Sequence, residues 1–468
     1  MMPRRLSQYP ESYRAKEMQV IADWLLAGES GSVVGLPGCG RTNLLEFLCH
    51  RPEILARYLP DAADAVALIP VDLNHLPAND SATLYRVLLR AFYWVRERFN
   101  PNVKERIARL YIENRATQDP FLSQSALHEM LFTFQAQQTQ VVLVLNHFAE
   151  FCKEADARLL NTLRGLRDSF KETLCFIVGM KQAVMYLPQR DMLGDIYELL
   201  DSNVCWVGAM AESDARYVIH QATRTAPTKP NEEEMAHMLH LTGRFPVLLK
   251  TIGHWWQKTD LPLAEWKVYL EQIHHFEFRL EKLWNGLSNE EQFALAAVCE
   301  WQELVEKGKG SLKAFERLEK DHAPILTRLR KKEVCDQQGE HWFIHGQLLI
   351  AYIRRVGPSG RGRIRVEGKA EQLYQGLAHL NKLTPQEDAL LRFLIEHPYE
   401  RQAYPELINA VWSKEGADYA GVTNNSLQQL VSNLRKKIEV DNSNPRYIIS
   451  WRSKQQGGYQ FYPEGRPV

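Results

Sequence analysis

The chain has 468 residues and carries 57 Lys and Arg residues against 57 Asp and Glu residues, so its formal net charge is zero. Its length exceeds what one hydrophobic core supports, which predicts three or four domains, and the balanced charge leaves nucleic-acid binding to local basic clusters. No stretch approaches the length of about 20 apolar residues that spans a bilayer, and the N-terminus from Met1 to Gln8 lacks an apolar signal region, so we predict a cytoplasmic protein without membrane contact. The seven cysteines lack C-x-x-C spacing, which predicts neither disulfides nor structural zinc.

A helical pattern from Tyr13 to Leu26 leads into a short apolar strand and then into a glycine-rich loop that reads G-x-x-x-x-G-R-T from Gly35 to Thr42. In this strand–loop–helix context the glycines let backbone N–H groups approach a pyrophosphate at a helix N-terminus; the alternative is an ordinary glycine turn. We predict that ATP or ADP binds here, with Mg²⁺ on Thr42 where a metal is bound. The predicted nucleotide-binding residues of the loop are Gly35, Pro37, Gly38, Cys39, Gly40, Arg41, Thr42 and Asn43.

Arg41 occupies the position at which such loops normally carry a lysine. It keeps the positive charge, but its guanidinium is a wide planar fork rather than a compact ammonium, which changes how it reaches the β- and γ-phosphates. Nucleotide binding can therefore survive where hydrolysis does not.

The second nucleotide motif is altered as well. The apolar run Val141–Leu145 predicts a buried parallel strand, which should end in an aspartate that holds the magnesium shell, but Asn146 and His147 follow instead. An amide can accept a hydrogen bond from a metal-bound water but brings no negative charge, and a histidine is a poor substitute for a water-activating carboxylate. Glu150 either compensates or is a solvated surface acid. We therefore assign no catalytic residue and predict slow or absent hydrolysis.

Residues 1–185 show strands separated by helices, which predicts a parallel α/β sheet with its ligand at the carboxyl ends of the strands. Besides the strand before the loop and the strand ending at Asn146, strand-like runs are Ala65–Leu73 and Leu174–Gly179. Helices are predicted between the strands at Ser81–Phe99, Gln124–Gln138 and Ala155–Phe170.

From about Tyr186 the strand signal fades and helical periodicity takes over, which predicts a helical lid over 186–278. The turn from Gly243 to Pro246 stops one helix and starts the next, because proline suits a first helical turn. The predicted lid helices are Ser213–Ala222, Glu232–His240 and Pro246–Trp256.

An internal winged helix is predicted over 279–356. Ser288 and Glu291 form a capping-box pattern, Ile325–Lys332 reads as a short basic helix, and Val334–His345 reads as a hairpin around Gly339. Residues 357–372 are a basic linker by their glycine, proline and arginine content, either a solvated spacer or a strap along phosphates.

Residues 373–468 contain three predicted helices and a hairpin. In the third helix, Asn424–Val440, apolar residues from Leu427 to Ile438 form one stripe at 3.6-residue spacing, and amides and basic residues occupy the opposite face. Amides suit contacts to adenine in a major groove, and basic residues suit phosphates. The predicted DNA-binding residues are Asn425, Gln428, Gln429, Ser432, Asn433, Arg435 and Lys436 on the helix, and Arg452, Lys454 and Tyr459 in the hairpin.

The segment from Leu383 to Tyr462 resembles the OmpR/PhoB-type winged helix-turn-helix. The resemblance rests on the Leu-Thr-Pro-x-Glu opening, Ala410-Val411-Trp412, Leu434-Arg435-Lys436-Lys437, Pro445-Arg446-Tyr447-Ile448 and Gly458-Tyr459. It implies that the third helix enters the major groove of double-stranded DNA and that Arg452 in the wing approaches the minor groove or its phosphates. Ser432 and Asn433 depart from the arginines that many relatives carry.

The segment from Tyr13 to Arg355 resembles the STAND and origin-recognition branch of AAA+ proteins. The phosphate loop, the strand to Asn146, the sensor-like strand to Gly179, and the Gly243-x-x-Pro246 turn follow the family's order. The resemblance implies that Pro246, in the lid, helps to sense the bound nucleotide. The fold class is therefore a multidomain α/β plus α protein: a P-loop parallel α/β sheet, a helical lid, an internal winged helix and a C-terminal winged helix-turn-helix.

These patterns favour a bacterial transcription regulator in which a nucleotide-binding module with weak or absent hydrolysis controls DNA binding, with a homo-oligomer or a protein partner as further options. Two alternatives stay open. One is an active AAA+ ATPase that loads or remodels a DNA complex, and the other is a protein-interaction scaffold with a dead nucleotide pocket.

Overall fold

The computed structural model of the chain describes residues 9–60, 62–187, 190–308, 310, 312–356, 364–367, 372–375, 378–412, 422–439, 442, 445–453, 456–463 and 465. The chain divides into two compact units. The first comprises Met1–Lys229 and Arg244–His254, and the second comprises Pro230–Gly243 and Trp255–Val468. A search of the described helices for one with the length and apolarity to span a bilayer finds none.

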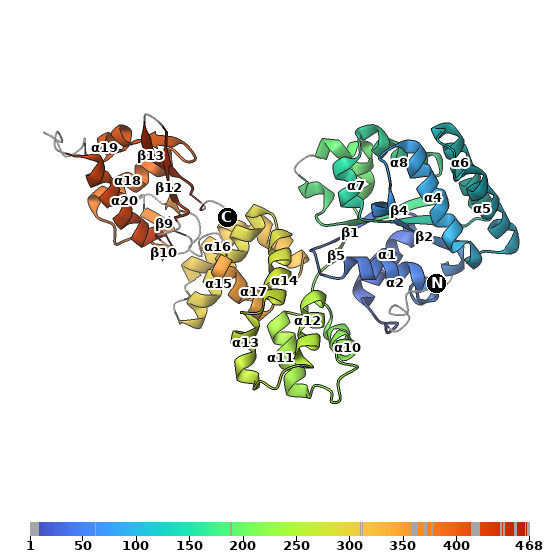
Figure 1. Ribbon diagram of the computed structural model, residues 1–468, viewed down its shortest axis with the longest axis horizontal. Coiled ribbons are helices and arrows are strands. Elements are labelled where there is room, and N and C mark those ends of the chain that lie inside the picture. Colours follow the sequence, from blue (N-terminus) through green and yellow to red (C-terminus); the bar gives the residue numbers. More distant parts are fainter. Residues whose placement is uncertain are drawn as a thin grey trace. The chain divides into compact units, whose positions relative to one another are not determined.

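The first unit is built on a five-stranded sheet with the order β2-β3-β4-β1-β5 (Figure 1). Every neighbouring pair is parallel, which confirms the predicted α/β sheet. The strands β3 and β4 are buried almost throughout, as expected where helices cover both faces of a parallel sheet. The strands are β1 (Gly31–Gly35), β2 (Val66–Asp72), β3 (Gln140–Asn146), β4 (Leu174–Met180) and β5 (Val204–Val207).

Helices lie on both faces of this sheet. The main core joins one face of the strands to helices α4 to α8, whereas α1 and α2 lie on the other side (Figure 1). The helices of this unit are α1 (Ala15–Ala27), α2 (Arg41–His50), α3 (Pro52–Tyr58), α4 (Ser81–Val95), α5 (Pro101–Asn114), α6 (Pro120–Gln135), α7 (Phe148–Glu154), α8 (Ala157–Ser169), α9 (Tyr197–Leu200) and α10 (Glu212–Ala222), with 3₁₀ turns at Ala63–Ala65, Leu73–His75, Arg96–Arg98, Val184–Tyr186 and Arg190–Ile196.

The edge strand β5 has no counterpart among the strands expected from the sequence. It is only four residues long, and its residues alternate between half-buried and buried. All four of its residues are apolar, but so short a run, in a segment where helical periodicity prevails, does not stand out as a strand.

The second unit begins with helices and a small hairpin. Its elements before the C-terminal part are α11 (Glu232–Thr242), the end of α12 (Pro246–Trp256), α13 (Leu263–Leu270), α14 (His274–Asn285), α15 (Asn289–Glu306), α16 (Leu312–Lys331), β6 (Cys335–Gln338), β7 (His341–Ile344) and α17 (Gln347–Val356). The strands β6 and β7 pair antiparallel around Gly339, where the sequence predicts a hairpin. The predicted short basic helix is the last part of α16, which continues through Pro324.

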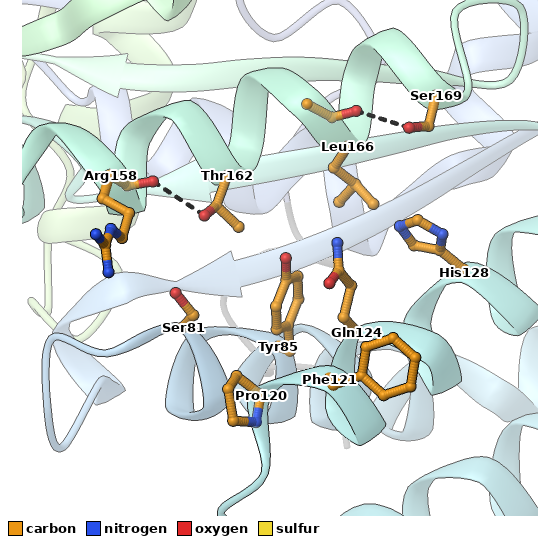
Figure 2. A pocket seen from close by; sticks show the side chains of 11 residues that line it. Ser81, Tyr85, Pro120, Phe121, Gln124, His128, Arg158, Thr162, Leu166 and Ser169 are labelled. Atoms are coloured by element: carbon orange, nitrogen blue, oxygen red, sulfur yellow. Dashed lines mark hydrogen bonds between the residues drawn. The ribbon is translucent and has the colours of Figure 1, made fainter.

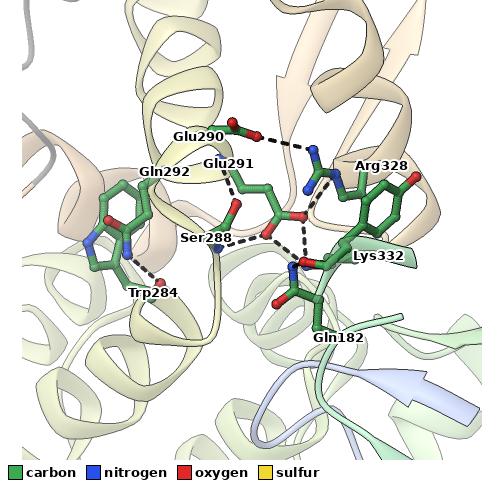
Figure 3. A network of polar contacts seen from close by, with 9 residues as sticks. Gln182, Trp284, Ser288, Glu290, Glu291, Gln292, Arg328 and Lys332 are labelled. Atoms are coloured by element: carbon green, nitrogen blue, oxygen red, sulfur yellow. Dashed lines mark hydrogen bonds and ion pairs between the residues drawn. The ribbon is translucent and has the colours of Figure 1, made fainter. Parts of the chain in front are cut away.

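A buried ionic network holds α15 to α16 (Figure 3). Ser288 and Glu291 form the predicted capping box, and the same Glu291 carboxylate pairs with Lys332 at 2.7 Å and with Arg328 at 3.5 Å. Glu291 and Lys332 are both buried, and burial lowers the pKa of Lys332 against the opposing charge of Glu291. One residue thus caps a helix and anchors its neighbour.

The C-terminal part of the second unit contains two three-stranded antiparallel sheets with the orders β10-β9-β8 and β11-β13-β12. Strand β8 lies within the segment 357–372 that we interpreted as a linker, and its Ile364 belongs to the same core as the three helices. The elements are β8 (Ile364–Glu367), β9 (Gln372–Gln375), β10 (Ala378–His379), α18 (Pro385–Glu396), β11 (Arg401–Ala403), α19 (Tyr404–Trp412), α20 (Asn424–Ile438), β12 (Ile448–Arg452) and β13 (Gly457–Phe461).

Candidate nucleotide and DNA sites

The glycine-rich loop joins β1 to α2 in a conformation that only glycine adopts readily. Gly38 and Gly40 have φ angles of 87° and 88°, and Gly40 is the N-cap of α2. A Cβ atom on Gly38 would lie 2.7 Å from a methyl carbon of Val247. The loop therefore needs glycine both for its backbone and for the close approach of another segment.

That other segment is the start of α12. The backbone N–H of Val247 donates to the Gly38 carbonyl at 3.2 Å, and the Pro246 ring lies 3.4 Å from the position of a Cβ on Gly40. The structure thus brings Pro246 next to the loop residues predicted from the sequence, although a contact of Pro246 with nucleotide stays a prediction. Thr42 is the second residue of α2 and is half-buried, whereas Asn43 is exposed.

Arg41 is held by the strand ends. Its Nη1 donates to the Met180 carbonyl, at the end of β4, and to the Gly35 carbonyl at 3.3 Å. Its Nε is buried and has no hydrogen-bond partner among the described residues. Burial lowers the pKa of Arg41. The guanidinium that replaces the usual lysine is therefore bound to backbone carbonyls.

The altered second motif lies at the same edge of the sheet. Asn146 ends β3 beside Asp72 of β2, and its Oδ1 accepts the backbone N–H of His147 at 3.0 Å. His147 has a left-handed φ of 58°, and its Nδ1 lies 2.8 Å from Asp72 Oδ1. A carboxylate that holds Nδ1 fixes the ring orientation and leaves Nε2 as the other polar atom of the imidazole. An Asp–His pair therefore stands where the sequence predicts only a lone histidine.

Glu150 is paired rather than solvated. Its Oε1 lies 2.5 Å from Nζ of Lys181, the first residue after β4. Burial pushes the pKa of Glu150 upward, but the hydrogen bond and charge of Lys181 outweigh it, so this pKa lies below the ordinary value. Among the described residues no group of three or more His, Cys, Asp and Glu side chains is arranged to hold a metal ion.

Arg14 was not identified from the sequence, but in the structure it is hydrogen-bonded to the main chain of the phosphate loop. It is 2% exposed, and its Nη2 donates to the carbonyls of Cys39, in the loop, at 2.8 Å and of Gly208, after β5, at 2.9 Å. Its Nη1 pairs with Glu17 at 2.6 Å, and its backbone N–H donates to Asp214 at 2.9 Å. The sequence carries no signal for this role beyond an arginine in the turn before a helix.

Helix α20 has the two faces predicted for it. Leu427, Leu430, Val431, Leu434 and Ile438 are buried. Of the predicted DNA-binding residues on the helix, Asn425, Gln428, Gln429 and Lys436 are exposed, and Ser432, Asn433 and Arg435 are half-buried.

Arg435 uses its guanidinium to bind the protein itself. Its Nε donates to the Ile448 carbonyl at 3.0 Å, and its Nη2 donates to Ser450 Oγ at 3.0 Å. Tyr459 is 5% exposed and packs against Tyr404 in the core, whereas Arg452 is exposed at the end of β12. Lys454 lies outside the described residues.

Solved structures are similar to the chain at low sequence identity. They include a Walker-type ATPase of Pyrococcus abyssi (15% identity, 75% of this chain, 99% of that chain, TM-score 0.44), the Aeropyrum pernix ORC2 protein in ADPNP and ADP complexes (13%, 73%, 92%, 0.39) and Cdc6p from Pyrobaculum aerophilum (12%, 76%, 95%, 0.34). No curated protein matches the chain.

One family match concerns the C-terminal part. Residues 379–461 match the family described as "Transcriptional regulatory protein, C terminal". The match covers the helices α18 to α20 and the hairpin β12–β13, which is the segment in which the sequence resembles the OmpR/PhoB type. Residues 379–461 therefore form a winged-helix domain of the transcriptional regulatory protein C-terminal family.

Proposed function

We propose that the chain is a nucleotide-responsive DNA-binding regulator, in which the phosphate-loop unit binds ATP or ADP with little or no hydrolysis and controls the C-terminal winged helix. Support for nucleotide binding comes from the loop itself. Gly38 and Gly40 have left-handed φ angles and lead into the N-terminus of α2, and glycine loops at helix N-termini are the kind that binds phosphates through backbone N–H groups. The partner of the C-terminal domain would be double-stranded DNA.

Weak hydrolysis follows from the two altered motifs. Arg41 donates hydrogen bonds to the carbonyls of Met180 and Gly35. Because these bonds hold its guanidinium in place, it is not free to move with a transferred phosphoryl group and stabilise the charge that develops on it. Asn146 adds no negative charge for a metal shell. If Mg²⁺ accompanies the nucleotide, the hydroxyl of Thr42 is the group that would hold it.

The proposed control of DNA binding by nucleotide is supported by helix α12, whose two ends belong to different units. The helix begins against the loop, through Val247 and Pro246, and its residues up to His254 belong to the first unit. Its last two residues belong to the second unit, where Trp255 packs on Trp266 and the Trp256 indole donates to Glu234 at 3.1 Å. A nucleotide that moves the loop would therefore act directly on a helix that continues into the unit with the DNA-binding domain.

Nucleotide can shift such an arrangement only by its differential affinity for the two states. The test is to measure the affinity for a double-stranded DNA fragment at low salt, by fluorescence anisotropy, with no nucleotide, with ADP and with ATP. We expect the DNA affinity or the oligomeric state to change with nucleotide. If the protein binds nucleotide but its DNA affinity and oligomeric state are the same in all three conditions, the proposal that nucleotide controls DNA binding is wrong.

A matched pair of glycine variants sharpens this test. Gly38→Ala and Gly339→Ala both place a Cβ at a positive φ, but only the first meets another segment, since no described atom lies within 4 Å of the Cβ position at Gly339. Gly38→Ala should abolish the nucleotide dependence, and Gly339→Ala should keep it.

A second candidate function is a slow ATPase. The observation in its favour is the Asp72–His147 pair, because a carboxylate that orients an imidazole makes it a better general base than a lone histidine. Phosphate release that is abolished by both His147→Gln and Thr42→Ala would favour this reading over a non-hydrolysing switch.

A further inference from the structure

A pocket of about 460 Å³ lies between the helices α4, α6 and α8 of the first unit (Figure 2). None of its lining residues belongs to the phosphate loop or to the strand ends around Arg41. Its volume is within the range of small-molecule sites, which are about 300–1,000 Å³. The pocket is therefore large enough for a ligand of its own, independent of nucleotide.

A glycine keeps part of this pocket empty. Gly165 lies in the middle of α8, where glycine is among the least favourable residues for a helix. Neither of the usual reasons for a glycine applies, because its φ is not positive and no described atom beyond the backbone of its own helix turn lies within 4 Å of the position of a Cβ. The glycine leaves open space at the wall of a pocket, which is what accommodation of a ligand requires.

The lining has one positive charge and no negative one among the described residues. Arg158 is exposed at the pocket, and within the described part of the chain its guanidinium makes no hydrogen bond or ion pair. Burial lowers the pKa of His128, the other basic side chain of the lining, which keeps this imidazole neutral at pH 7. The charge available to a ligand is thus a guanidinium, which binds carboxylates through two parallel hydrogen bonds.

The remaining wall combines aromatic rings with a few polar groups. The Phe121 ring stands at the pocket and is 71% exposed, while Tyr85 is buried. The Gln124 side chain lies beside Tyr85 and points toward α8 in Figure 2, and it has no hydrogen-bond partner among the described residues. Aromatic rings favour a planar ligand by stacking or edge contacts, and a free amide adds one directional hydrogen bond.

We propose that the pocket between α4, α6 and α8 binds a small planar aromatic carboxylic acid, with its carboxylate on Arg158 and its ring against the aromatic side chains of the lining. Gly165 provides the space beside the ring. The site is distinct from the nucleotide site and does not depend on nucleotide being bound.

The test is calorimetric and ligand-observed NMR titration of the full chain with benzoate, 4-hydroxybenzoate and indole-3-carboxylate, and with the corresponding neutral amides. We expect at least one acid to bind with a dissociation constant below about 1 mM and its amide to bind about tenfold more weakly or not at all. Failure of all three acids to bind would overturn the proposal, as would equal affinity for acids and amides.

Two pairs of variants locate the site. Arg158→Gln should weaken acid binding about tenfold, whereas Arg164→Gln should leave it unchanged, because Arg164 lies on the same helix but pairs with Asp168 at 2.9 Å. Gly165→Leu should block binding by filling the pocket, and Gly165→Ala should keep the fold and weaken binding less. Binding that survives both Arg158→Gln and Gly165→Leu places the ligand elsewhere and overturns the proposal; if Gly165→Leu does not fold, the arginine pair decides.

Discussion

The guanidinium of Arg41 donates a hydrogen bond to the main-chain carbonyl of Met180, at the end of strand β4. This contact joins the residue that replaces the lysine of the phosphate loop to the strand next to β1, and it lies beside Asn146, whose Oδ1 is 3.3 Å from the Cβ position of Gly179. The two altered positions of the nucleotide motifs are therefore neighbours. One change replaces a mobile ammonium by a guanidinium of the same charge, and the other replaces a carboxylate by a neutral amide, so the pair of changes removes both catalytic elements and leaves one more positive charge at this edge of the sheet.

Reversing both changes should restore hydrolysis. In the double variant Arg41→Lys/Asn146→Asp, a compact ammonium can reach the phosphates and a carboxylate can support the metal shell, so we expect ATP turnover to rise by about tenfold or more over the parent chain. The measurement is phosphate release at saturating MgATP, with the added variant Thr42→Ala as the control that should abolish it. Turnover that stays at the parent's value in the double variant, with nucleotide still bound, would mean that other residues limit hydrolysis.

Removing Arg14 should destabilise the first unit. Arg14→Met leaves Glu17 buried without its partner and leaves the carbonyls of Cys39 and Gly208 without a donor, for which a loss of about 3–5 kcal/mol is expected. Urea unfolding and nucleotide affinity should both report the change, since Cys39 is in the loop. The matched control is Arg57→Met: its side chain is 58% exposed and pairs with Glu11 at 3.6 Å, so a loss of less than about 1 kcal/mol is expected. Equal losses in both variants would contradict the supporting role of Arg14.

Much of the first unit could be predicted from the sequence because apolar runs and glycines carry local signals. The strands around Ile69, Leu143 and Ile177 are continuous apolar segments, and the loop from Gly35 to Thr42 has a fixed spacing. Strand β5 is apolar as well, but it is only four residues long, so its run is too short to be distinguished from the helical pattern around it. A pattern of residue types therefore marks the longer strands, including β2 at the other edge of the sheet, and misses a short one.

In the candidate nucleotide and DNA sites, too, the sequence predicts individual residues but not the contacts between them. His147 and Glu150 could be identified from their position after a strand, but their partners Asp72 and Lys181 come from other strand ends that only the sheet order brings together. In the second unit, the apolar stripe of α20 predicts the helix and its exposed face, whereas the binding of Arg435 to β12 depends on tertiary packing.

The ion pair between Glu387 and Lys437 should make the C-terminal domain sensitive to acid. It links α18 to α20, and Glu387 is buried. Burial raises the pKa of Glu387, but the hydrogen bonds from Lys437 and Thr384 outweigh it, so the folded-state pKa lies below the unfolded value of about 4.3. The stabilisation is therefore fully present above that unfolded value and is lost as the pH falls through the folded pKa.

Glu387→Gln removes this dependence. Hydrogen exchange of the α20 amides between pH 7 and pH 3 should show that protection in the parent decreases more steeply on acidification than in the variant. Asp388→Asn is the control, because Asp388 pairs with Arg392 on the same helix and is 39% exposed. A parent and a Glu387→Gln variant with parallel pH profiles would contradict the assignment.

Substitutions of the neighbouring basic residues Arg435 and Lys436 should have different effects on DNA affinity and on the stability of the domain. Lys436 is exposed, so Lys436→Gln should weaken DNA binding at all sequences and reduce the slope of log affinity against log salt by about 1. Arg435→Gln removes the donors to Ile448 and Ser450, so it should loosen the β12–β13 hairpin and lower the stability of the domain as well. Anisotropy titrations at several salt concentrations measure the first effect, and hydrogen exchange of β12 measures the second. A domain that remains as stable with Arg435→Gln as with Lys436→Gln would show that the contacts of Arg435 with the hairpin are dispensable, and that Arg435 acts on DNA like its neighbour.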